Sequence, residues 1–62
     1  MCIGARGEET HLLDEARRAY KQGNLEKLKD IRERLMDMRA SAESLYIVTK
    51  MIEEVQARQR AP

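Results

Sequence analysis

Apolar residues recur near the start of this chain at the spacing of one face of an α-helix. Over about residues 10–22 they lie three, four and seven positions apart, at Leu12, Leu13, Ala16, Ala19 and Tyr20. Thr10 precedes them as a candidate N-cap, because its hydroxyl can accept a hydrogen bond from a backbone N–H of the first turn. The pattern predicts a short amphipathic helix over about 10–22.

A turn is predicted at Gly23 and Asn24. Glycine is the preferred residue in the left-handed conformation that ends a helix, and asparagine is a preferred residue for capping the next one. Residues 15–28 read EARRAYKQGNLEKL and resemble the middle of a tetratricopeptide repeat, in which two helices are joined at such a position. The resemblance covers about a quarter of the chain. It departs at Leu28, where the repeat has a small residue, and no second repeat follows. It therefore supports a helix–turn–helix joint and implies no function.

The second apolar segment follows a seven-residue repeat. Its a positions are Leu28, Leu35, Ala42 and Thr49, and its d positions are Ile31, Met38, Leu45 and Ile52. Such a repeat is typical of a helix that packs along another helix. It predicts a long second helix over about 25–60 and an all-α helical hairpin that assembles as a coiled coil or a four-helix-bundle-like structure.

A kink or break near residues 39–44 is the alternative. This stretch is small and polar, and Ser41 or Ser44 could cap a third helix. Turns between helices usually contain Gly, Asn, Asp or Pro, however, and residues 39–44 contain none of these. That absence favours the continuous helix.

A continuous second helix has a consequence for its C-terminal half. At about 1.5 Å per residue it is about 50 Å long, whereas the first helix is about 20 Å long and covers only its beginning. The most apolar part of the chain would stay uncovered, which is typical of an interface. The predicted interface residues are Leu45, Tyr46, Val48, Met51, Ile52 and Val55.

Composition and charge exclude several classes of protein. The 62 residues contain no Phe or Trp, three Gly and one Pro, which disfavours a β-sheet protein. Cys2 is the only cysteine, so the chain can form no internal disulfide, and no apolar run is long enough to span a membrane. These features predict a cytoplasmic protein with a flexible arm over 1–8 and a single helical-hairpin domain over 9–62.

Candidate catalytic and ligand-binding chemistry is scarce. His11 is the only histidine, and with Cys2 it makes no metal-ligand set. We expect no catalytic residues, no metal and no cofactor. The 12 basic and 11 acidic residues are interleaved, which is typical of a solvated helix face and disfavours nucleic-acid binding without excluding it.

The sequence thus predicts a small non-enzymatic regulatory, adaptor or inhibitor protein. Its expected partner is a second copy, giving a homodimer, or the helix of a target protein. The alternative is a small dimeric nucleic-acid-binding regulator that uses basic residues of the long helix.

Within this interpretation, Ile52→Asp should dissociate the assembly or abolish partner binding, because it places a charge in the centre of the predicted interface. Light scattering and a binding assay would check this. A folded, monomeric variant with unchanged activity would contradict it.

Overall fold

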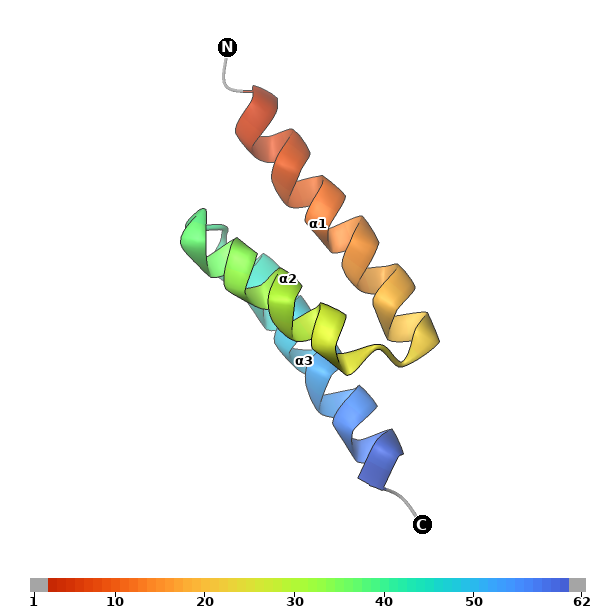
Figure 1. Cartoon of the computed structure of the whole chain (residues 1–62). Coiled ribbons are helices and arrows are strands. Elements are labelled where there is room, and N and C mark those ends of the chain that lie inside the picture. The colour runs from red at the N-terminus through yellow and green to blue at the C-terminus, as the bar shows by residue number, and fades with distance from the viewer. Residues whose placement is uncertain (1–2, 61–62) are drawn as a thin grey trace.

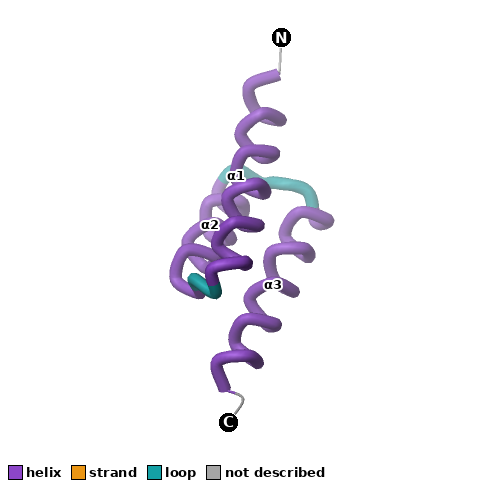
Figure 2. The backbone as a smooth tube through the Cα atoms, turned by 90° about the vertical axis from the view of Figure 1, so that its right-hand side faces the viewer, coloured by secondary structure: helices purple, strands orange, loops and turns teal. Residues whose placement is uncertain are grey.

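The chain folds into an elongated helical bundle. The computed structural model describes residues 3–60, with the side chains of residues 7–60. Within residues 3–60 it contains α1 (Ile3–Gln22), α2 (Leu25–Asp37) and α3 (Ala42–Arg60), which confirms the all-α prediction for this part (Figure 1). Helix α2 runs antiparallel to α1, and α3 turns back beside both, so that α1 begins and α3 ends at opposite ends of the bundle (Figures 1 and 2). The bundle measures 49 × 18 × 15 Å.

Helix α1 starts earlier than its apolar pattern predicts. It begins at Ile3, so residues 3–8 of the expected flexible arm are helical, and Thr10 lies inside the helix instead of capping it. Residues 1 and 2 of that arm lie outside the described residues. Good helix formers surround the glycines in this stretch, and one glycine costs a helix only about 1 kcal/mol relative to alanine. Helix propensity therefore extends α1 beyond its apolar stripe.

The turn between α1 and α2 forms as predicted. Gly23 adopts a left-handed conformation with φ +72°. Its N–H donates to the carbonyl of Tyr20, and the N–H of Asn24 donates to that of Ala19, the paired bonds of a Schellman motif. The Asn24 side chain then accepts a hydrogen bond of 3.2 Å from the N–H of Lys27, which caps α2.

The expected continuous helix over 25–60 is wrong, because the chain turns again between Asp37 and Ala42. Arg39 adopts φ +56°, the conformation that glycine supplies in the first turn. The hydrogen bonds are also those of a Schellman motif, from Arg39 N–H to Met36 O and from Ala40 N–H to Leu35 O. The alternative prediction, a break in the second helix near residues 39–44, is therefore correct. It lacks the usual sequence signal because an arginine holds the glycine position.

The second turn brings α3 over the other helices and builds one core. Each helix contributes a buried stripe, and the stripes meet along the bundle axis. The buried apolar residues are Leu12, Ala16, Ala19, Leu28, Ile31, Leu35, Val48, Ile52 and Val55. The inference that residues 45–55 lack a cover within the chain is therefore wrong for Val48, Ile52 and Val55, which α1 and α2 cover, whereas Tyr46 and Ile47 stay exposed.

Both turns favour glycine at their left-handed position, so gaining a glycine and losing one should have opposite effects on stability. Arg39→Gly should raise the free energy of unfolding by roughly 0.5–1 kcal/mol, because glycine adopts positive φ without the steric cost that other residues bear there. Gly23→Ala should lower the free energy of unfolding by about 1–2 kcal/mol, which is the cost of positive φ for a residue with a Cβ. No steric clash adds to this cost, because a Cβ at Gly23 meets no atom within 4 Å. Urea unfolding followed by circular dichroism measures both changes. Destabilisation by Arg39→Gly would contradict the assigned turn.

Candidate functional site

The predicted interface residues divide into buried and accessible ones. Val48, Ile52 and Val55 are 0%, 5% and 1% exposed and belong to the core of this chain. They are therefore not available to a partner of the folded bundle. Ile52→Asp would place a charge in that core, so it would test folding and not an interface.

The remaining predicted interface residues lie toward the surface of α3. Leu45 and Met51 are partly buried and pack against the core, whereas Tyr46 is 64% exposed. Ile47, beside Tyr46, is 38% exposed. The structure thus does not gather the six predicted residues on one accessible face.

A polar cluster ties the start of α3 to α1. Ser41 caps α3 by accepting a hydrogen bond of 3.3 Å from the N–H of Ser44. The carboxylate of Glu9 accepts hydrogen bonds from the hydroxyls of Ser41, at 3.1 Å, and of Ser44. Ser44 is only 5% exposed, so its hydroxyl needs this partner. A carboxylate at a helix N-terminus is also favoured by the helix dipole.

A second polar cluster ties the end of α1 to α3. The Tyr20 hydroxyl donates a hydrogen bond to Glu54 and accepts one of 2.8 Å from the Arg58 guanidinium. That guanidinium lies 4.8 Å from the centre of the Tyr20 ring, within reach of a cation–π interaction. The side-chain amide of Gln59 donates to the Gly23 carbonyl at 3.1 Å. These bonds fix the α1–α2 turn against the last turns of α3.

A surface groove lies between α2 and α3. It encloses about 470 Å³ and runs along both helices, with residues at helical spacing on each side. Its apolar part is mainly Met36, which is 51% exposed, because Ile52 is only 5% exposed. The lining residues are Lys29, Arg32, Glu33 and Met36 of α2, and Thr49, Ile52, Glu53 and Gln56 of α3.

Sequence reasoning missed most of this groove. Of its lining residues only Ile52 was among the predicted interface residues. A signal was nevertheless present, because Lys29, Arg32, Glu33 and Met36 share one helix face beside the apolar repeat of α2. What the sequence did not reveal was that α3 folds back and supplies the opposite wall.

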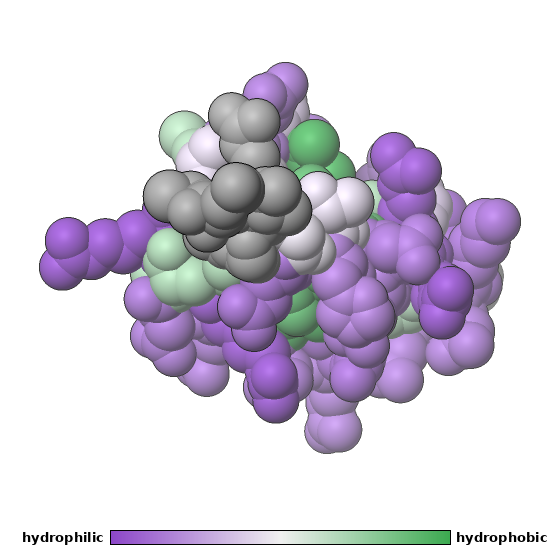
Figure 3. Space-filling model, turned by 90° about the horizontal axis from the view of Figure 1, so that it is seen from above, coloured by the Kyte–Doolittle hydropathy of each residue, from purple (hydrophilic) through white to green (hydrophobic). Residues whose placement is uncertain are grey.

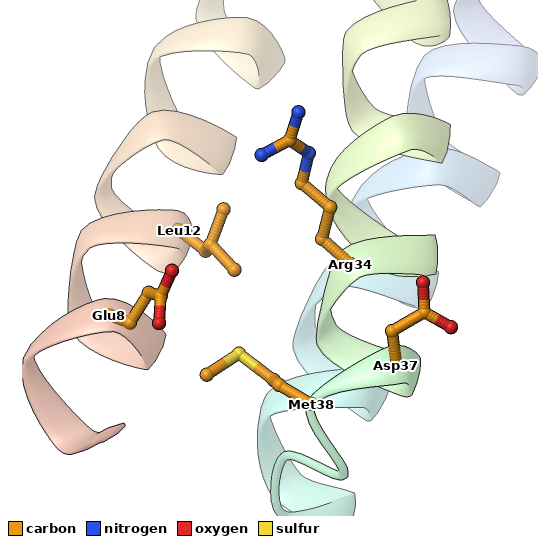
Figure 4. A pocket seen from close by; sticks show the side chains of 5 residues that line it. All are labelled: Glu8, Leu12, Arg34, Asp37 and Met38. Carbon is orange, nitrogen blue, oxygen red and sulfur yellow. The ribbon is translucent and has the colours of Figure 1, made fainter. Parts of the chain in front are cut away.

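Smaller hollows lie between α1 and α2. In one of about 290 Å³, Leu12 and Met38 point toward each other from the two helices, with Glu8 and Arg34 beside them (Figure 4). Its lining mixes apolar and charged side chains, and Arg34 is already paired with Asp30 at 3.3 Å. No reactive pair of groups is arranged among the five residues that line this hollow.

The ion pairs found among the described side chains all lie within single helices, between residues three or four positions apart. Three of them join an acidic residue to an arginine four positions later, namely Asp14 with Arg18, Asp30 with Arg34, and Glu54 with Arg58. Seen from above, the visible face is mainly hydrophilic, with apolar side chains in small separate areas (Figure 3). Among residues 3–60 no group of three or more His, Cys, Asp or Glu side chains is placed to hold a metal ion.

None of the helices described here combines the length and the apolar content that a membrane-spanning helix needs. No protein-family model, curated protein or solved structure matches the chain. The resemblance of residues 15–28 to a tetratricopeptide repeat is thus limited to the helix–turn–helix joint.

The Tyr20 cluster predicts a pH-dependent stability. The hydrogen bond to Glu54 holds the pKa of Tyr20 above its usual value of about 10, and desolvation raises that pKa further. The protonated phenol is therefore favoured in the folded state. Its stabilising effect is complete below pH 10 and is lost as the pH rises through the raised pKa.

In a Tyr46→Phe background Tyr20 is the only tyrosine, so tyrosinate absorbance reports its titration directly. Tyr20 should ionise at higher pH in the folded protein than in the urea-unfolded protein, and Glu54→Gln should reduce the difference. Equal titration in the folded and unfolded states would contradict the cluster.

Proposed function

We propose that this chain is a small non-enzymatic protein-binding module that receives one helix of a partner protein in the groove between α2 and α3. The observation that carries the proposal is the half-exposed Met36 in the groove between α2 and α3. A helix seated there would complete a four-helix bundle, a common way to cover apolar surface between two helices.

The groove has the features of helix-in-groove recognition. Its lining residues cover about two turns of each helix, which matches the contact length of a short amphipathic helix. Methionine suits such a site because its flexible side chain adapts to the surface that it meets. Thr49 adds a polar group to the floor.

Charges along the two walls favour one kind of partner helix. The α2 wall carries Lys29, Arg32 and Glu33, and no ion-pair partner of Lys29 or Arg32 lies within 4 Å among the described side chains. On the α3 wall, Glu53 is paired with Lys50 at 3.6 Å. A partner with an apolar stripe and acidic residues on the α2 side would therefore complement Lys29 and Arg32. Such flanking charges set orientation and partner choice in helix pairs.

The hollows and the charged side chains of the surface support a non-enzymatic role. The hollow beside Leu12 mixes apolar and charged side chains, and its Arg34 is paired with Asp30. The ion pairs also leave the basic residues interleaved with acidic ones, which disfavours the nucleic-acid alternative. We place the module in the cytoplasm, because its only cysteine requires no oxidising compartment.

The groove is tested by placing a photo-crosslinking residue at position 36 and, as the control, at exposed position 21 on α1. A protein that crosslinks from position 36 and not from position 21 is then produced recombinantly. Met36→Glu should weaken its binding by about tenfold or more, because the variant puts a charge on the apolar part of the groove. Lys21→Glu, remote from the groove, should change binding by less than about twofold.

Isothermal titration calorimetry measures the affinities, and circular dichroism shows that both variants are folded. If no protein crosslinks preferentially from position 36, or if a folded Met36→Glu variant binds the partner as tightly as the wild type, the proposal fails.

A further inference from the structure

The turn between α2 and α3 contains none of the residue types, Gly, Asn, Asp or Pro, that usually favour a turn. Residues 38–41 are Met, Arg, Ala and Ser, and the whole stretch 25–60 contains no glycine, proline or second asparagine after the cap at Asn24. Most of these residues favour a helix interior. The closed turn, by contrast, holds Arg39 at φ +56°, where a residue with a Cβ is strained.

The apolar repeat also continues through this turn without a break in register. Met38, Ala42 and Leu45 fall on the d, a and d positions that link the α2 stripe to the α3 stripe. In the closed bundle these same stripes pack α2 against α3, since Leu35 and Ile52 are both buried. One helix over 25–60 would therefore present a single continuous stripe, suited to an antiparallel partner of identical sequence.

We infer that residues 38–41 form a hinge at which α2 and α3 join into one helix, and that two copies of this chain then exchange α3 to form a domain-swapped dimer. In the swapped dimer, α3 of one copy packs on α1 and α2 of the other. Strained, short connections between exchangeable elements favour such swapping.

Exchange preserves the contacts that hold α3 in the monomer. The bonds of Glu9 to Ser44 and of Tyr20 to Glu54 and Arg58 join α1 to α3, so each can form equally well between two chains. The buried surface of Val48, Ile52 and Val55 is likewise covered by the same residues, now from the partner copy. Only the hinge differs: the strain at Arg39 disappears, and the cap that Ser41 provides is replaced by backbone hydrogen bonds.

A second copy of this chain is the favoured partner, because only an identical chain can reproduce all the contacts that α3 makes with α1 and α2. Since two chains must meet, the dimer fraction rises with protein concentration. The groove between α2 and α3 is rebuilt in the dimer from two chains. The inference therefore does not depend on what binds in that groove.

The hinge is tested by comparing Arg39→Gly with Arg39→Ala, both of which remove the arginine side chain. Glycine relieves the strain of the closed turn and weakens the joined helix, whereas alanine keeps the strain and favours the helix. After refolding from urea at about 1 mM, light scattering should show a dimer whose association constant is lower for Arg39→Gly than for Arg39→Ala, on the order of a hundredfold. Gly7→Ala, in open space on α1, should behave as the wild type does.

Exchange is distinguished from association of closed monomers by refolding ¹³C-labelled chains together with unlabelled ones. Isotope-filtered nuclear Overhauser effects should connect the Tyr20 ring of one chain with Arg58 of the other, because these groups touch only when α3 lies on α1. A chain that stays monomeric after this refolding, equal association constants for the two Arg39 variants, or a dimer in which Tyr20 and Arg58 touch only within one chain would overturn the inference.

Discussion

The left-handed conformation of Arg39 is the constraint on which the rest of this structure depends. It ends α2, reverses the chain within four residues and lets Ser41 cap α3. Without this reversal, Val48 and Val55 would face solvent on a long helix, and the chain would need a partner to cover them. With it, α1, α2 and α3 bury a shared core.

Polar clusters at the two ends of the α1–α3 contact determine how α3 is placed after the chain reverses. Glu9 with Ser41 and Ser44 fixes where α3 begins, and Tyr20 with Glu54 and Arg58 fixes where it ends. Apolar packing alone would allow α3 to slide or rotate, because aliphatic stripes of this kind are weakly directional. Hydrogen bonds at both ends restrict α3 to one register.

Local signals predicted the turn between α1 and α2 well, although they placed the start of α1 too late. Gly23 and Asn24 mark their turn with residue types that favour it, and the helical pairs such as Asp14 with Arg18 follow from spacing alone. The second turn escaped prediction because Arg39 carries no local preference for positive φ. Tertiary packing of α3 has to supply the free energy that holds it there.

The candidate site was harder to predict for the same reason. Apolar residues 45–55 indicate an interface only if α3 is uncovered, and whether it is uncovered depends on the turn. Tyr46 stays exposed, whereas Val48 and Ile52 enter the core. The groove beside Met36 exists only once α3 lies along α2, so its walls combine residues that are distant in sequence.

The most direct test of the fold is the nuclear Overhauser spectrum of the dilute, monomeric protein. We expect contacts from Tyr20 to Arg58 and from Glu9 to Ser44, which join α1 to α3. Unbroken helical contacts through residues 38–42, without any contact between α1 and α3, would contradict the account.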